Sequence, residues 1–84
     1  MMAYEIIWSP KSLSELRGLE HQIRQRIVRK TDDLKWAPYH FVEKLSDVDA
    51  WRLRVGDYRV ILDINEKAKR IEVLKVGHRK QVYK

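Results

Sequence analysis

The fold is decided by the stretch WRLRVGDYRVILDI, which spans residues 51–64. Apolar and polar side chains alternate with a period of two on both sides of Gly56-Asp57, a pattern typical of a β-hairpin with a two-residue turn. Counting outward from that turn pairs the residues one by one: Val55 with Tyr58, Arg54 with Arg59, Leu53 with Val60, and Arg52 with Ile61. The turn therefore predicts which side chains share a face.

This register gives the hairpin one apolar face and one basic face. The apolar set suits packing under helices and consists of Trp51, Leu53, Val55, Tyr58, Val60 and Leu62. The opposite, uncovered face carries Arg52, Arg54 and Arg59. Like charges directly across a sheet cost roughly 0.2–1 kcal/mol. Solvation would explain one such pair, but three arginines predict a phosphate site, because a bound phosphate turns repulsion into charge-assisted hydrogen bonds.

The location of the charge supports the same interpretation. The net charge is +6, yet residues 1–50 hold eight Lys and Arg against eight Asp and Glu. Residues 51–84 hold ten against four, so the whole excess lies in this last part of the chain. A local positive field of this kind favours a phosphate-bearing or acidic partner.

The rest of the chain predicts a single α+β domain over residues 1–84. A β-favouring run at residues 4–8 leads into Ser9-Pro10, a helix N-cap followed by proline at the first helical position. Helical spacing then continues, with a break near Gly18, until Ala37-Pro38. Residues 38–49 show no period and are interpreted as a connecting loop, and residues 71–76 form another strand. We expect two N-terminal helices on one face of a small, mainly antiparallel four-stranded sheet, in the order strand, helix, helix, strand, strand, strand.

Several classes of protein do not fit this composition. The chain has no cysteine, and its three histidines are scattered, so neither a disulfide framework nor a zinc site is expected. Nothing resembles a signal peptide or a membrane-spanning run. We expect a soluble, cytoplasmic protein that needs no cofactor or metal and binds no membrane.

Two further groups of residues are candidates for chemistry. The chain ends in the basic run GHRKQVYK, residues 77–84, in which Tyr83 offers a ring for base stacking. Glu43, Asp47 and Asp49 are carboxylates that fit either a site or simple loop solvation. Taken singly, each residue of the C-terminal run is better explained by surface exposure or packing at the core rim, and loop solvation explains the three carboxylates as easily as a site does.

Together these motifs resemble the RelE/ParE toxin superfamily, and the RelE branch more closely. The resemblance rests on Leu45 followed by WRLRVGDYRV at residues 51–60, VGHR at 76–79, the closing Val82-Tyr83, and Ile7-Trp8-Ser9-Pro10 before the helices. It covers essentially the whole chain. It implies the toxin of a type II toxin–antitoxin system, a ribosome-dependent mRNA endoribonuclease that inhibits translation. It also implies an acidic, RelB-like antitoxin that wraps the toxin in a hetero-oligomer.

The resemblance also assigns roles to individual residues. Arg52 and Arg54 occupy positions where basic groups, usually lysines, help to activate the 2′-hydroxyl and hold the phosphate. Arg59 and Arg79 match arginines that bind phosphate and stabilise the transition state, and Tyr83 matches a tyrosine that stacks on the substrate or aids proton transfer. Arginine is a poor general base, so electrostatic stabilisation is the more credible role of Arg52 and Arg54.

The proton acceptor and the target of the toxin stay open at this point. Histidine titrates near neutral pH, which makes His78 a candidate for proton transfer. Adjacent side chains on an extended segment point apart, however, so its nearness to Arg79 in sequence does not place it in the site. Two alternatives to the nuclease are a ParE-like toxin that inhibits DNA gyrase without cutting RNA, and a degenerate member that only binds its antitoxin.

Overall fold

The hairpin forms with the predicted register in the computed structural model, which describes residues 2–82. Strand β3 spans Trp51–Val55 and strand β4 spans Tyr58–Asn65, and their partners are those counted outward from Gly56-Asp57. Gly56 has a φ of +58°, a conformation that glycine adopts without strain. Glycine with positive φ at the first turn position is a feature of type II′ hairpin turns. The local turn chemistry thus confirms the expected pairing.

The sheet has five strands, and the prediction of four was wrong. Their order is β1-β5-β4-β3-β2, where β1 spans Glu5–Trp8, β2 spans Val42–Lys44 and β5 spans Arg70–His78. β1 is parallel to β5, and the other pairs are antiparallel. The additional strand β2 lies inside the segment interpreted as a loop. Three residues are too few to show an alternation, and this strand is defined by its pairing with Trp51–Leu53 of β3.

The two helices form where the sequence predicts them. Helix α1 spans Pro10–Arg17 and is capped by Ser9, whose Oγ accepts a hydrogen bond from the Ser12 backbone N–H at 3.1 Å. Gly18 ends α1, and helix α2 then spans His21–Asp32, followed by a 3-10 turn at Asp33–Lys35. Within residues 2–82, no helix is long and apolar enough to cross a lipid bilayer.

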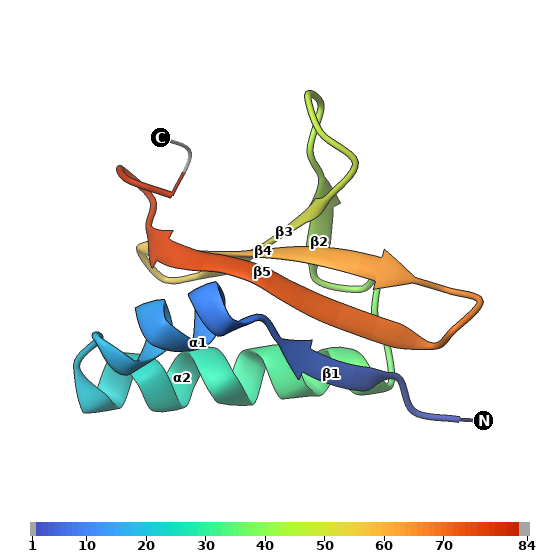
Figure 1. Cartoon of the computed structure of the whole chain (residues 1–84), viewed down its shortest axis with the longest axis horizontal. Helices are drawn as coiled ribbons and strands as arrows, with labels where there is room; N and C mark the ends of the chain where they lie inside the picture. The colour runs from blue at the N-terminus through green and yellow to red at the C-terminus, as the bar shows by residue number, and fades with distance from the viewer. Residues whose placement is uncertain (1, 83–84) are drawn as a thin grey trace.

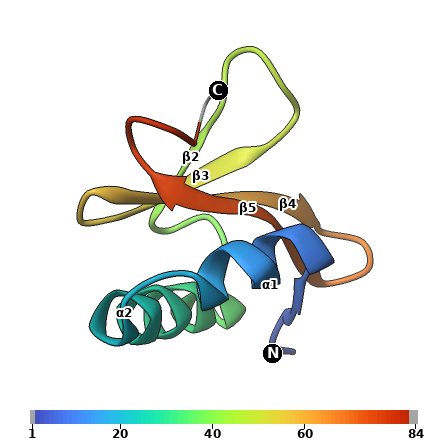
Figure 2. The same cartoon turned by 60° about the vertical axis from the view of Figure 1, so that its left-hand side comes forward.

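Both helices cover the same face of the sheet, as the two views in Figures 1 and 2 show. The core between them joins helix residues to the apolar face of the hairpin and to β5; its buried members include Leu16, Ile27, Leu34, Leu53, Val55, Val60, Leu62, Ile71, Val73 and Val76. Two polar contacts fix α1 on β5. The buried Ser12 Oγ donates to the Val73 carbonyl at 2.9 Å, and Glu15 Oε1 accepts from the Val76 N–H at 3.0 Å.

The opposite face of the sheet is partly covered, whereas the sequence predicted that it is open. The loop between β2 and β3 and the turn that follows β5 both rise from this face (Figure 1). Under them a small cluster buries Ala50, Ile61 and Val82, with Leu45 packed against it. The alternation of the hairpin places Ile61 on this side, but nothing local reveals that Val82 returns to cover it. The arginines therefore share their face with a second, smaller apolar cluster.

The turn glycine gives a direct test of the hairpin geometry. Gly56→Ala should destabilise the protein by about 1–2 kcal/mol, because an alanine at positive φ is strained. The added Cβ would also lie 3.0 Å from a guanidinium nitrogen of Arg26. Gly18→Ala is the matched control, because Gly18 has a φ of −78° and its added Cβ would meet nothing closer than 3.6 Å. This control should be neutral or stabilising by about 0.4–1 kcal/mol in urea denaturation. Equal stability of the two variants would contradict the assigned turn.

Candidate functional site

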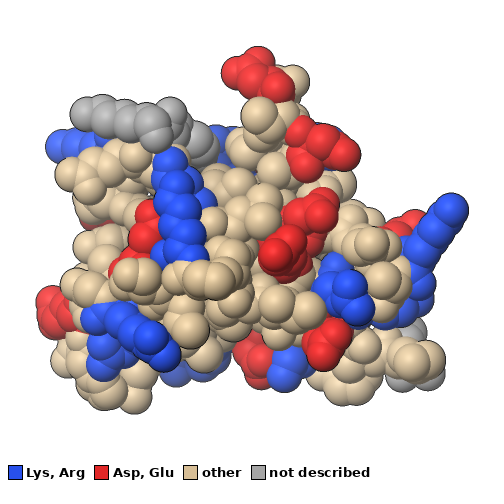
Figure 3. Space-filling view, viewed as in Figure 1, with Lys and Arg blue, Asp and Glu red and all other residues tan. Residues whose placement is uncertain are grey.

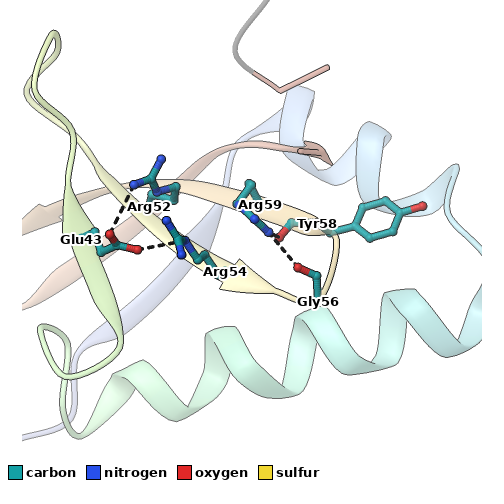
Figure 4. A network of polar contacts seen from close by, with 6 residues as sticks. All are labelled: Glu43, Arg52, Arg54, Gly56, Tyr58 and Arg59. Atoms are coloured by element: carbon teal, nitrogen blue, oxygen red, sulfur yellow. Dashed lines mark hydrogen bonds and ion pairs between the residues drawn. The ribbon is translucent and has the colours of Figure 1, made fainter. Parts of the chain in front are cut away.

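Three arginines lie together on the face of the hairpin that points away from the helices. Arg52 and Arg54 come from β3, and Arg59 comes from β4 (Figure 4). The register places Arg54 directly opposite Arg59, which confirms the like-charge pair expected from the sequence. The core on the other side of the sheet fixes this arrangement, because a slip of one residue would bury the arginines and expose the core.

Glu43 joins two of these arginines and was not singled out as a partner for them by sequence. It lies on β2 directly opposite Arg52 in the ladder. Its Oε1 is 3.0 Å from Nε of Arg54, and its Oε2 is 3.3 Å from a terminal nitrogen of Arg52 (Figure 4). The sequence signal for this contact was weak, since it depends on the short strand β2.

Arg59 is held differently, by the hairpin turn itself. One of its terminal nitrogens donates to the carbonyl oxygens of Gly56 and Tyr58, each at 2.8 Å. These contacts turn the guanidinium back toward the turn (Figure 4). Backbone carbonyls do not neutralise a guanidinium charge, so Arg59 keeps its full positive charge beside Arg54.

Arg79 reaches the same turn from the segment after β5. Its backbone N–H donates to the Asp57 carbonyl at 2.8 Å, and its Nε lies 3.8 Å from Oδ1 of Asp57. The guanidinium is about half exposed, with a side-chain accessibility of 55%. The fold therefore brings Arg59 and Arg79, which are twenty residues apart, to one two-residue turn.

The other two candidates of the C-terminal segment are placed differently. His78 is paired with Tyr58, and its ring makes an edge contact with the Tyr58 ring at a centroid distance of 5.4 Å. Arg59 lies opposite Gly77 in the same ladder, and Figure 4 shows Tyr58 pointing away from Arg59. His78 thus lies with Tyr58 and not with the arginines, and its part in proton transfer stays a prediction. Tyr83 lies outside the described residues, so the structure does not test its expected role.

A hollow adjoins the arginine face at the base of the loop between β2 and β3. It has a volume of about 400 Å³ and is lined by Leu45, Ser46, Asp47, Val48 and Arg52. The tip of this loop carries acidic side chains (Figure 3). Asp49, which precedes β3 in this loop, is ion-paired with Lys44, and the hydrogen bond from that ammonium group lowers the pKa of the Asp49 carboxyl from its ordinary value. The negative charge of the Asp49 carboxylate is therefore balanced by the Lys44 ammonium group.

The chemistry available at this surface is anion binding. Guanidinium groups from β3, β4 and the segment after β5 present charged donors in planar forks, the geometry that suits phosphate and carboxylate oxygens. Within residues 2–82, no three His, Asp or Glu side chains come together in a way that would hold a metal ion. The arrangement is suited to binding phosphate and stabilising additional negative charge on it.

Fold and arginine face together define a toxin of the RelE/ParE type, and comparison with known proteins bears this out. The family model described as ParE toxin of type II toxin-antitoxin system, parDE, matches residues 6–83. The chain belongs to this family and is a toxin of a type II toxin–antitoxin system within the RelE/ParE superfamily. No curated protein sequence matches the chain at a significant level.

Solved structures agree with this assignment. RelE from the archaeal RelE–RelB complex of Pyrococcus horikoshii OT3 is 31% identical, with a TM-score of 0.83 over 96% of this chain and 100% of that one. The RelBE2 complex of Mycobacterium tuberculosis gives 23% identity and a TM-score of 0.86 over 94% of each chain. The intact RelBE complex of E. coli gives 24% identity and a TM-score of 0.78 over 90% of this chain and 96% of that one. The latter two identities establish the fold alone.

Proposed function

We propose that this toxin is an endoribonuclease of the RelE branch, which cuts messenger RNA on the ribosome and so inhibits translation. The observation that carries the proposal is the convergence of Arg52, Arg54 and Arg59 on one sheet face, with Arg79 at the adjoining turn. The similarity to an archaeal RelE at 31% identity supports the same branch.

The proposed reaction is an internal displacement within the RNA. The 2′-oxygen loses its proton to an acceptor and forms a bond to the adjacent phosphorus. The bond between phosphorus and the 5′-oxygen of the next nucleotide breaks, and that oxygen takes up a proton. The products are a 2′,3′-cyclic phosphate and a 5′-hydroxyl end. Negative charge on the phosphorane increases during the step, so fixed guanidinium groups stabilise the transition state more than the ground state.

The individual residues contribute mainly through charge and position. We assign phosphate binding and transition-state stabilisation to Arg52, Arg54, Arg59 and Arg79, and stacking or proton transfer to Tyr83. Arginine is a poor proton acceptor, and the acceptor of the 2′-hydroxyl proton is unassigned. Holding the 2′-oxygen in line with the leaving oxygen contributes several kcal/mol in its own right. On this proposal the ribosome supplies that geometry, and the toxin supplies the charge.

The alternative function is inhibition of DNA gyrase. One observation favours this alternative. The family model that matches the chain is described as the ParE toxin of parDE systems. A gyrase inhibitor acts by binding and requires no chemistry at the arginine face. The two functions therefore differ in whether RNA is cut and in which macromolecule is inhibited.

The chemistry is tested with messages on programmed ribosomes. Cleavage should leave a 2′,3′-cyclic phosphate and should continue in EDTA when polyamine keeps the ribosome assembled. A single 2′-deoxy substitution on the 5′ side of the scissile phosphate should abolish cleavage, because it removes the nucleophile. Normal cleavage of the deoxy-substituted message would refute the mechanism. If neither message is cut while gyrase supercoiling is inhibited, the ParE-like function replaces the nuclease.

The role of the arginine face is tested by Arg59→Ala. Loss of one fixed donor to developing charge should lower the cleavage rate on the order of 10²-fold or more. Folding should change by less than about 1 kcal/mol, because the lost hydrogen bonds to the turn are offset by relief of repulsion with Arg54. Arg70→Ala is the matched control, since Arg70 lies at the far end of β4 and β5 and pairs with Glu5 at 3.6 Å. Parallel loss of stability and activity in Arg59→Ala would assign Arg59 a structural role instead.

We also propose that an acidic, RelB-like antitoxin wraps this toxin in a hetero-oligomer. Structural relatives are complexes of RelE with RelB, and the charge excess of residues 51–84 suits an acidic chain that folds on binding. The gene should neighbour one that encodes a short acidic protein. Adding that purified protein should raise the melting temperature of the toxin and suppress its activity. An unchanged melting temperature and unchanged activity at saturating concentrations would exclude the wrapping model.

A further inference from the structure

Glu43 already occupies donors that a substrate phosphate needs. Its two carboxylate oxygens are bound to different arginines, Oε1 to Nε of Arg54 at 3.0 Å and Oε2 to a terminal nitrogen of Arg52 at 3.3 Å. Carboxylate and phosphate oxygens are recognised by the same guanidinium fork. The Glu43 carboxylate and a phosphate therefore compete for the same nitrogens of Arg52 and Arg54, and only one of the two anions can bind there at a time.

The fold presents Glu43 at this place for a structural reason. The β2–β3 ladder puts Glu43 directly opposite Arg52, and Arg54 follows two residues along on the same face of β3 (Figure 4). The Glu43 and Arg54 side chains are 51% and 57% exposed. The Arg52 side chain is less exposed, at 23%. Ion pairs between exposed side chains contribute little to stability, so another anion can exchange with the Glu43 carboxylate at small cost, above all at Arg54.

We infer that Glu43 is a built-in competitor for the phosphate site: the substrate phosphate binds Arg52 and Arg54 by displacing the Glu43 carboxylate. This inference rests on the proposed function insofar as the phosphate belongs to RNA. Arg59 is bound by backbone carbonyls and makes the first contact with the polyanion, while Arg79 is about half exposed and lies 3.8 Å from the Asp57 carboxylate. Displacement of Glu43 then opens the nitrogens of Arg52 and Arg54 that it holds to the same strand of RNA.

Two consequences would show that Glu43 competes with phosphate, and neither is expected if Glu43 has no effect on phosphate binding. Removing the carboxylate raises affinity for a phosphate backbone, since no internal anion has to be displaced. It also makes the net charge of the site more positive by one, because a negative carboxylate is removed. The logarithm of the binding constant should then fall more steeply with the logarithm of salt concentration, by a slope of about 0.7 for a single strand.

The experiment compares Glu43→Gln with Asp49→Asn in the full-length toxin. Both variants remove one negative charge from the same β2–β3 hairpin. Asp49 is 95% exposed and is paired with Lys44, whereas Glu43 is paired with the arginines. The probe is a fluorescent single-stranded 2′-O-methyl oligoribonucleotide, which binds but has no 2′-hydroxyl to react. Thermal melts of each variant verify that the chain is folded.

Glu43→Gln should bind the probe about threefold to thirtyfold more tightly than the wild type, as expected when the ion pairs of Glu43 with Arg54 and Arg52 no longer have to be broken. Asp49→Asn should change the affinity by less than about twofold. Glu43→Asp keeps the charge but shortens the side chain by one methylene, so it should reach fewer donors and bind with intermediate affinity. Equal affinities and equal salt slopes for Glu43→Gln and Asp49→Asn would overturn the inference.

Cleavage on programmed ribosomes is measured separately, so that the two proposals fail independently. Tighter binding by Glu43→Gln with no cleavage by the wild-type toxin would support the competitor and reject the nuclease. Cleavage by the wild type with no difference in binding between Glu43→Gln and Asp49→Asn would support the nuclease and reject the competitor.

Discussion

The backbone pairing of β3 with β4 about Gly56-Asp57 is the constraint on which the rest of the structure depends. It fixes which side chains of the hairpin enter the core and which face the site. Leu53, Val60 and Leu62 are at most 2% exposed, and burying side chains of this size contributes about 1.5–3 kcal/mol each. A slip of one residue would forfeit that contribution, so the core holds the arginines in register.

The free energy gained by burying the core also explains how the sheet tolerates Arg54 opposite Arg59. Repulsion across one pair costs roughly 0.2–1 kcal/mol, which is small beside the burial of a single core residue. The conflict is further reduced by local contacts. Glu43 binds Arg54, and the turn carbonyls bind Arg59. The protein thus keeps a concentrated positive charge on one face because the opposite face supplies the stability.

Membership of the toxin family and the arrangement of the site answer different questions. The family model and the solved relatives establish the class of toxin, but superfamily members share the fold across different targets. The candidate site of this chain is built from arginines, with Arg52 and Arg54 on β3 and Arg59 on β4. Because arginine does not readily give up its proton, the contribution proposed for Arg52 and Arg54 is charge stabilisation and not proton transfer. Glu43 places a carboxylate on two of these arginines, where we infer that a bound phosphate displaces it.

The sequence by itself determined the features that depend on neighbouring residues. Alternation about Gly56-Asp57 predicted the register and the two faces, and Ser9-Pro10 and Gly18 predicted the limits of α1. Only the tertiary structure revealed β2, the pairing of Glu43 with two arginines, the burial of Ile61 under Val82, and the position of His78 beside Tyr58. Ile61 and Val82 are 21 residues apart and Tyr58 and His78 are 20 apart, while Glu43 meets Arg52 and Arg54 across a loop whose sequence shows no hairpin pattern. Periodicity and turn chemistry act over a few residues, whereas such contacts are selected by the packing of the whole domain.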